Sequence, residues 1–182
     1  IGVLGGGRGT AAHFGLTDQV DLTMGTFSKS FASLGGFIAA AADVIHYIQH
    51  HARSLIFSAS MPPSNAAAAL AALDVMEAEP ERIARVNQIG ERMRAGFHEL
   101  GFNVGASETP IIPVIIGDDM NTFMAWKSLY EAGIYTNPVV SPAVPPELAL
   151  LRTSYMATHT DEQLDRVLAT FAEVGRELAL VD

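Results

Sequence analysis

The chain has 182 residues, 49% of them hydrophobic, which is enough to bury a sizeable core in one domain or in one and a half. The net charge of −9 and the lack of a basic cluster argue against nonspecific nucleic-acid binding. The chain has no cysteine, so disulfides and thiolate metal sites are excluded and a cytoplasmic location is expected, and no apolar run reaches the roughly 20 residues that span a bilayer.

Residues 1–15 are predicted to form a structural loop. The glycine-rich run from Gly5 to Thr10 lacks the Gly-Lys-Ser/Thr ending of a Walker loop, and no complete strand precedes it as the dinucleotide fingerprint requires. His13 is interpreted as a packing or surface residue, because no second metal ligand lies at helical spacing. The start at Ile1 does not have the pattern of a signal peptide and suggests a fragment or a processed chain.

A strand, a polar turn and a second strand are predicted next. The alternating apolar run at residues 20–24 and the apolar run at 37–40 predict two buried strands, joined by the turn at 25–36. This turn contains Lys29, one of two lysines in the chain; the other, Lys127, lies in a helical pattern far downstream.

The residues around Lys29 suggest a chemical role. A lysine held against apolar surface loses its proton more easily and can attack a carbonyl carbon. Thr26, Ser28 and Ser30 can donate hydrogen bonds to an anion beside it. A lysine beside an anion cradle is what a Schiff base with pyridoxal phosphate (PLP) requires. The alternative is a surface lysine with incidental serines, and composition alone does not separate the two.

Residues 43–51 are predicted to form a short helix. His46 and His50 share one face of it, but a zinc site needs a third ligand, so a solvated face is favoured over a metal site. A short strand at 55–57 is expected to end at Ser58, whose simplest role is to cap the strand end.

Two long helices are expected after that. Ser64 is predicted to cap the first, over residues 65–78, and the second follows Pro80, over residues 81–100. The pattern then changes to short alternating elements, which predict a smaller α+β domain. Its expected elements are a strand at 111–116, a helix at 121–132, a strand at 134–136, a proline-rich loop at 138–146, a strand at 148–155 and a final helix at 161–178 capped by Thr160.

Arg152 is the second candidate functional residue. A lone arginine in an otherwise apolar strand is costly unless an anion pairs with it, and its planar fork suits bidentate contact with a carboxylate. The alternative is an ion pair with a carboxylate elsewhere in the chain. His159 either shares this site or supports the start of the final helix.

Four motifs, in this order, resemble the α-oxoamine synthases, which are fold-type I PLP enzymes of the α/β class. They are residues 25–36, residues 56–63, the pair Leu151-Arg152 and residues 157–160. Relatives usually have glycine where this chain has Ser28, and the Thr-Phe-Ser-Lys-Ser form is most similar to the serine-condensing bacterial members. The resemblance covers essentially the whole chain, but only the C-terminal half of the family's enzyme.

The resemblance implies a homodimer that condenses an amino acid with an acyl-CoA and releases carbon dioxide, as in sphingolipid biosynthesis. It implies that Lys29 forms the Schiff base and moves protons at the substrate α-carbon. Thr26 and Ser28 would bind the cofactor phosphate, together with Ser58 from the neighbouring subunit. Arg152 would hold the substrate carboxylate. No metal is expected.

The resemblance also implies two domains. Residues 1–100 would end the large PLP-binding domain, and residues 101–182 would form the small C-terminal domain. The family's aspartate for the pyridine nitrogen falls before Ile1, so the 182 residues alone are expected to be inactive. The alternatives are another fold-type I enzyme, such as 8-amino-7-oxononanoate synthase, 2-amino-3-ketobutyrate CoA ligase or an aminotransferase, and an inactive partner subunit. The presence of Lys29 argues against the last, since inactive subunits lack this lysine.

Overall fold

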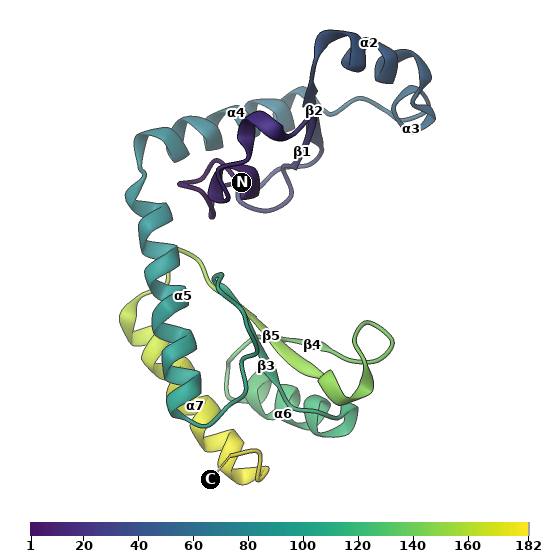
Figure 1. Cartoon of the computed structure of the whole chain (residues 1–182). Coiled ribbons are helices and arrows are strands. Elements are labelled where there is room, and N and C mark those ends of the chain that lie inside the picture. Colours follow the sequence, from purple (N-terminus) through teal and green to yellow (C-terminus); the bar gives the residue numbers. More distant parts are fainter. Residues whose placement is uncertain (182) are drawn as a thin grey trace. The chain divides into compact units, whose positions relative to one another are not determined.

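The computed structural model describes residues 1–181, which divide into two compact units (Figure 1). The N-terminal unit is Ile1–Ala84, and the C-terminal unit starts at Arg85. The boundary therefore lies inside a helix, α5 (Glu81–Glu99), and earlier than the expected boundary at residue 100. The reason is packing: the buried side chains of α5 belong to the core of the C-terminal unit.

The N-terminal unit contains one β-hairpin and several helices. Its elements are α1 (Thr10–His13), a 3-10 turn η1 (Thr17–Gln19), β1 (Leu22–Thr26), β2 (Gly36–Ala40), α2 (Ala42–His51), α3 (Arg53–Ile56) and α4 (Pro63–Ala78). The hairpin confirms the predicted strand, turn and strand, and β1 pairs antiparallel with β2, from Leu22 opposite Ala40 to Thr26 opposite Gly36.

The two hairpin strands are not buried as expected. Among the described residues, β1 and β2 pair only with each other. Most of their side chains are exposed, including Met24 at 69% and Ile38 at 44%. Their apolar residues are therefore typical of buried strands, but no other strand among residues 1–181 pairs with them.

Two local predictions in this unit were wrong. Residues 53–56 form the helical turn α3 instead of a strand at 55–57, because a run of three apolar residues does not by itself distinguish the two. Ser64 does not cap α4, which already begins at Pro63, a favoured first residue because it lacks the N–H that a helix start leaves unpaired. The helix itself is confirmed.

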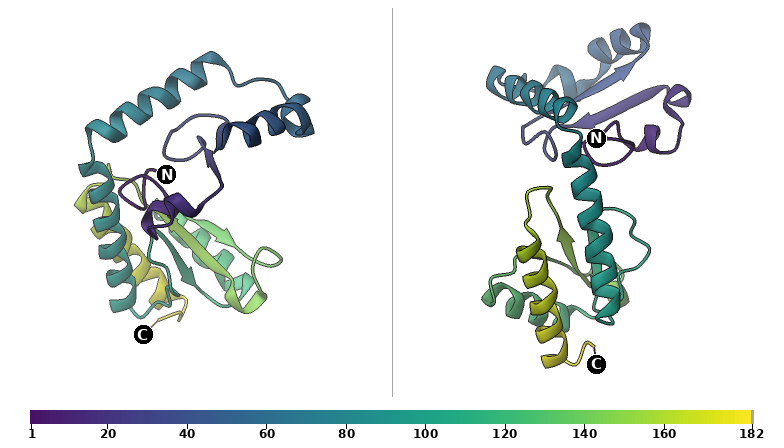
Figure 2. Two further views of the ribbon diagram at one scale, coloured as in Figure 1. Left: turned by 45° about the horizontal axis from the view of Figure 1, so that its top comes forward. Right: turned by 90° about the vertical axis from the view of Figure 1, so that its left-hand side faces the viewer.

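The C-terminal unit is a two-layer α+β structure. Its elements are most of α5, then β3 (Ile111–Ile115), α6 (Asp119–Glu131), β4 (Asn137–Val139), a 3-10 turn η2 (Pro146–Leu148), β5 (Leu150–Ser154) and α7 (Asp161–Glu177). The strands form an antiparallel sheet in the order β3-β5-β4, so that β5 is central. Figure 2 shows α5 and α7 side by side.

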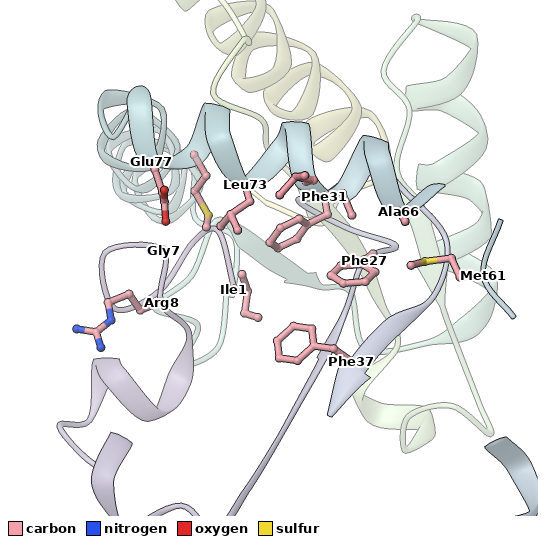
Figure 3. Close-up of a pocket in the computed structure, with 13 residues that line it drawn as sticks. Ile1, Gly7, Arg8, Phe27, Phe31, Phe37, Met61, Ala66, Leu73 and Glu77 are labelled. Atoms are coloured by element: carbon pink, nitrogen blue, oxygen red, sulfur yellow. The ribbon is translucent and has the colours of Figure 1, made fainter. Parts of the chain in front are cut away.

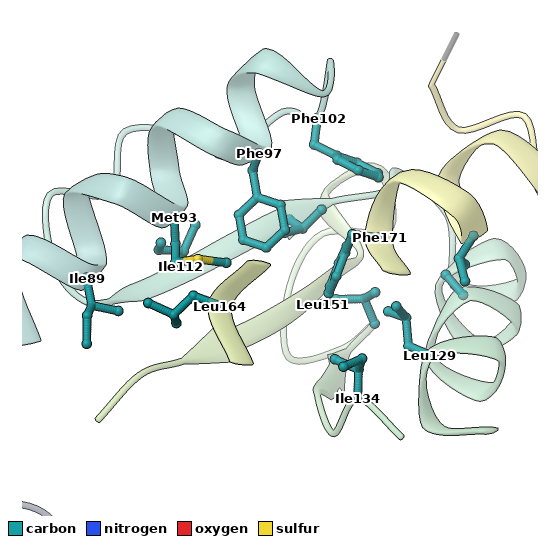
Figure 4. Close-up of a cluster of buried hydrophobic side chains, with 13 residues drawn as sticks. Ile89, Met93, Phe97, Phe102, Ile112, Leu129, Ile134, Leu151, Leu164 and Phe171 are labelled. Carbon is teal, nitrogen blue, oxygen red and sulfur yellow. The ribbon is translucent and has the colours of Figure 1, made fainter. Parts of the chain in front are cut away.

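One face of this sheet carries the core. Side chains of α5, α6 and α7 pack on Ile112 and Val114 of β3 and on Leu151 of β5 (Figure 4). Phe97 of α5 and Phe171 of α7 lie in edge-to-face contact, with ring centres 4.8 Å apart. Because side chains alternate along a strand, the residues between the core positions of β5 point to the opposite face.

The strand expected at 134–136 forms slightly later, as β4, because Ile134 and Thr136 are buried beside α6 rather than paired in the sheet. The helix start at Thr160 is confirmed. Its hydroxyl accepts from the backbone N–H of Gln163, whose side chain accepts from the backbone N–H of Thr160. None of the helices described is both long and apolar enough to cross a membrane.

Candidate active site

The Lys29 turn places a primary amine directly after a pair of hydroxyl residues in the sequence. The hydroxyl oxygens of Thr26 and Ser28 lie 2.9 Å apart, and the backbone N–H of Ser28 donates to Thr26. Both residues are exposed, so rotation about either C–O bond can direct an O–H group toward an anion. The Lys29 ammonium is exposed and makes no hydrogen bond or ion pair with any residue of the 1–181 range. No side chain or backbone group of the described residues therefore occupies this nitrogen.

The two hydroxyls and the amine of the turn fit the two groups of PLP that a protein engages: the phosphate, which is bound, and the aldehyde, which reacts. The segment from Thr26 to Gly36 contains no carboxylate that would repel an anion. Two hydroxyls suit phosphate oxygens, and the amine three residues after Thr26 suits a carbonyl carbon. The expectation that apolar surface desolvates Lys29 is not met within this chain, because the residue is exposed.

Aromatic packing anchors the back of the turn. Phe31 is 7% exposed, and Phe27 lies against both Phe31 and Phe37, with ring centres 5.3 and 5.8 Å away. On the other side, the hydroxyl of Ser33 donates to the backbone carbonyl of Asn65, in the first turn of α4, at 2.8 Å. The Asn65 side-chain amide donates back to Ser33 at 3.3 Å. These contacts fix the turn to α4.

The turn has a backbone conformation that few sequences adopt. Ala32 has a φ of 47°, in the left-handed region that disfavours residues with a Cβ, and its N–H donates to the carbonyl of Lys29 at 2.9 Å. At Gly36, a Cβ would meet the carbonyl oxygen of Gly25 at 2.4 Å, so the close approach of β1 and β2 below the turn requires glycine.

Ser58 makes no hydrogen bond with the other predicted phosphate ligands of the described chain. It follows α3, is exposed, and donates to the carbonyl of Ser54. No hydrogen bond joins it to Thr26, Ser28 or Lys29 within the described chain. Its expected role, toward the cofactor of a neighbouring subunit, stays a prediction.

Arg152 lies on the central strand β5 of the C-terminal unit, on the face away from the core. Its neighbours on β5, Leu151 and Thr153, point into the core, whereas Arg152 is exposed. The alternative of an ion pair within the chain is not formed, since the guanidinium has no carboxylate partner among residues 1–181. All of its donors are thus available to a ligand.

Two arginines of α5 bind the segment that joins β5 to α7 and the start of α7, and the sequence patterns did not predict these contacts. Arg85 donates to the Asp161 carboxylate at 2.7 Å and to the backbone carbonyl of His159 at 3.3 Å. Arg92 bridges Asp161 and Asp165. The hydrogen bond and the charge of Arg85, with Arg92 beside it, hold the pKa of the Asp161 carboxyl below its usual value. These partners are far apart in the sequence, so no local pattern identifies them.

His159 lies between β5 and α7, and its ring bonds to the loop before it rather than to α7, so both roles expected of it stay predictions. Its Nδ1 accepts from the backbone N–H of Met156 at 3.2 Å, so a neutral ring carries its hydrogen on Nε2. The histidines of α2 are exposed, and no group of three or more metal-ligating residues occurs in the part of the chain that the structure describes. His50 instead donates from Nδ1 to the carbonyl of His46 at 2.8 Å.

A cavity of about 570 Å³ lies behind the Lys29 turn (Figure 3). Its lining is mainly apolar and includes Ile1, Phe31 and Leu73, with Arg8 and Glu77 as its charged side chains. None of the predicted cofactor or substrate residues lines it. Because it lacks converging polar groups, the exposed side of the turn, and not this cavity, is the candidate active site.

Comparison with known proteins identifies the class that this fold and turn define. The model of the family described as aminotransferase class I and II matches residues 1–171, so the chain belongs to that family and has the fold-type I architecture.

Its relatives within the family are α-oxoamine synthases. The chain is 50% identical over 178 residues to a serine palmitoyltransferase of Sphingobacterium spiritivorum, covering 97% of this chain and 45% of the relative. It is 45% identical over 181 residues to an 8-amino-7-oxononanoate synthase of Symbiobacterium thermophilum, covering 99% of this chain and 46% of the relative. A solved serine palmitoyltransferase from S. paucimobilis, with a bound PLP–myriocin aldimine, superposes with a TM-score of 0.94 at 32% identity. The superposition covers 100% of this chain and 46% of the solved chain. The chain thus spans about half the length of the relatives it matches.

Proposed function

We propose that this chain is part of a PLP-dependent α-oxoamine synthase that condenses an amino acid, serine by preference, with an acyl-CoA. The observation that carries the proposal is the exposed Lys29 amine, which has no partner within residues 1–181 and follows the hydroxyl pair of Thr26 and Ser28 in the sequence. The identity to serine palmitoyltransferases supports serine and a long-chain thioester as the substrates. In this proposal the units are the end of the large domain and the small domain of a homodimer located in the cytoplasm.

Each predicted residue has a distinct task. PLP, when bound, supplies an electron sink that makes bond cleavage and acylation at the amino-acid α-carbon accessible. Thr26 and Ser28, with Ser58 of the neighbouring subunit, bind its phosphate. Lys29 holds the cofactor between turnovers, then takes and returns the α-proton. Arg152 would hold the carboxylate of the amino acid and so fix the orientation of the substrate.

The proposed activity is tested by incubating the full-length holoenzyme, a chain as long as its relatives and loaded with PLP, with serine and palmitoyl-CoA. Release of free CoA together with a decarboxylated product is expected. A second candidate, 8-amino-7-oxononanoate synthase, is favoured by the 45% identity and would release CoA with a different amino acid and thioester. A new oxo acid without CoA release would indicate an aminotransferase, and the absence of any turnover would favour an inactive subunit.

Arg152→Lys is expected to weaken amino-acid binding while leaving PLP binding nearly unchanged. Lysine keeps the charge but loses the two-pronged geometry, which costs roughly 1–3 kcal/mol of binding free energy. The measurement is a titration of the full-length holoenzyme with serine, followed by the change in cofactor absorbance. Unchanged serine affinity would assign Arg152 a structural role.

A further inference from the structure

The neighbour of Arg152 on the edge strand β4 is an asparagine. The register of the sheet places Asn137 directly opposite Arg152, with Pro113 of β3 opposite on the other side. Residues directly opposite in an antiparallel pair have Cβ atoms about 4.5–5.5 Å apart and point to the same face. Asn137 therefore lies beside Arg152 on the sheet face away from the core.

Neither side chain has a partner in the described part of the chain. No hydrogen bond or ion pair joins the Asn137 amide or the Arg152 guanidinium to another group in residues 1–181. By contrast, the side chain of Asn65 bonds Ser33, that of Asn103 bonds the backbone of Gly105, and that of Asn121 bonds Asp118. The half-buried Asn137 amide is not among the buried groups left without a partner, so a ligand or water can reach it, and this accessible, unpartnered amide sets Asn137 apart from the other three.

The surroundings favour an anion. Strands β3, β4 and β5 contain no carboxylate, and Arg152 is their one charged residue. Half-buried Pro113 and Leu150 flank the pair and reduce its contact with water. A carboxylate has about four acceptor positions, of which a bidentate arginine occupies two, so an amide N–H₂ beside it can fill a third.

We infer that Asn137 is a second carboxylate-binding residue, which donates from its side-chain nitrogen to the substrate oxygen held by Arg152. This inference rests on the proposed function, since it takes the amino-acid carboxylate as the ligand of Arg152. It makes the site a two-residue clamp built across one strand pair.

The test uses the full-length holoenzyme and two ligands, serine and 2-aminoethanol, which lacks only the carboxylate. Asn137→Ala is expected to weaken serine binding roughly tenfold, as loss of one hydrogen bond to a charged group does, and to change 2-aminoethanol binding by less than about twofold. Asn137→Asp should weaken serine binding further, because the new carboxylate pairs with Arg152 and repels the ligand. Val139→Ala, two residues along the same face of β4, is the matched control and should change neither ligand.

The outcomes separate the two proposals. If Arg152→Lys weakens serine binding but Asn137→Ala and Asn137→Asp do not, the inference about Asn137 is overturned and the proposed function stands. If serine binding resists all three changes, the assignment of the carboxylate to Arg152 fails as well. Equal weakening of both ligands by Asn137→Ala would also overturn the inference, because it would show a general effect on the fold or the cofactor. Circular dichroism of each variant verifies that it is folded.

Discussion

Replacing Lys29 with alanine will remove the covalent attachment of the cofactor and reduce turnover of the full-length holoenzyme by roughly 10²–10⁴-fold, the usual contribution of a positioned acid–base group. Lys29 is exposed, has no hydrogen-bond or ion-pair partner within residues 1–181, and directly follows Ser28, whose hydroxyl lies 2.9 Å from that of Thr26. In the unmodified enzyme, borohydride reduction followed by peptide mapping should place the pyridoxyl group on Lys29.

Lys127 provides the control for this experiment. It is the other lysine of the chain and lies on α6 of the C-terminal unit, where its Nζ is 3.6 Å from Oε1 of Glu131. Lys127→Ala should keep both the label and the activity. A pyridoxyl group found on Lys127, or a Lys29→Ala variant that is still labelled within this chain, would refute the assignment.

The 182 residues alone, with PLP added, are expected to show no CoA release with any amino acid. The electron sink needs a protonated pyridine nitrogen, which a carboxylate at the far edge of the ring maintains. The acids before Lys29 are Asp18 and Asp21. Asp21 immediately precedes β1, the strand that leads to Lys29, and a residue so close to the amine is poorly placed to reach the opposite edge of the ring.

A thiol-release assay on the 182-residue chain, beside a chain extended upstream through the family's Asp-x-Ala-His motif and the whole domain, measures this difference. Only the extended chain should turn over. Equal rates from the two would mean that residues within this sequence supply the acid, and would contradict the half-enzyme interpretation.

Local signals made much of the fold predictable from the sequence. Thr160 with Gln163 three residues later specifies a helix start, and the apolar stripe of α5 specifies its buried face. The run at residues 55–57 was assigned wrongly because three apolar residues have no measurable period. The hairpin was predicted correctly, but its burial was not, since burial depends on what lies next to a strand rather than on its own residues.

The Lys29 turn was predictable because its residues are close in sequence, and Arg152 because it is the one charged residue of an apolar strand. Thr26, Ser28 and Lys29 fall within four positions and form one turn. The contacts of Arg85 with Asp161 and of Ser33 with Asn65 join distant segments, and nothing in either segment indicates the other. The placement of Asn137 beside Arg152 depends on strand register, which the sequence of β4 alone does not determine.

The exposed hairpin has a practical consequence for handling this chain in solution. Both outer edges of β1 and β2 offer unpaired backbone groups within the described residues, and apolar side chains such as Leu22, Met24 and Ile38 accompany them. Edges of this kind template intermolecular strand addition and therefore aggregation. Dilute samples and low salt, at which the net charge of −9 keeps the molecules apart, are the conditions that keep it monodisperse.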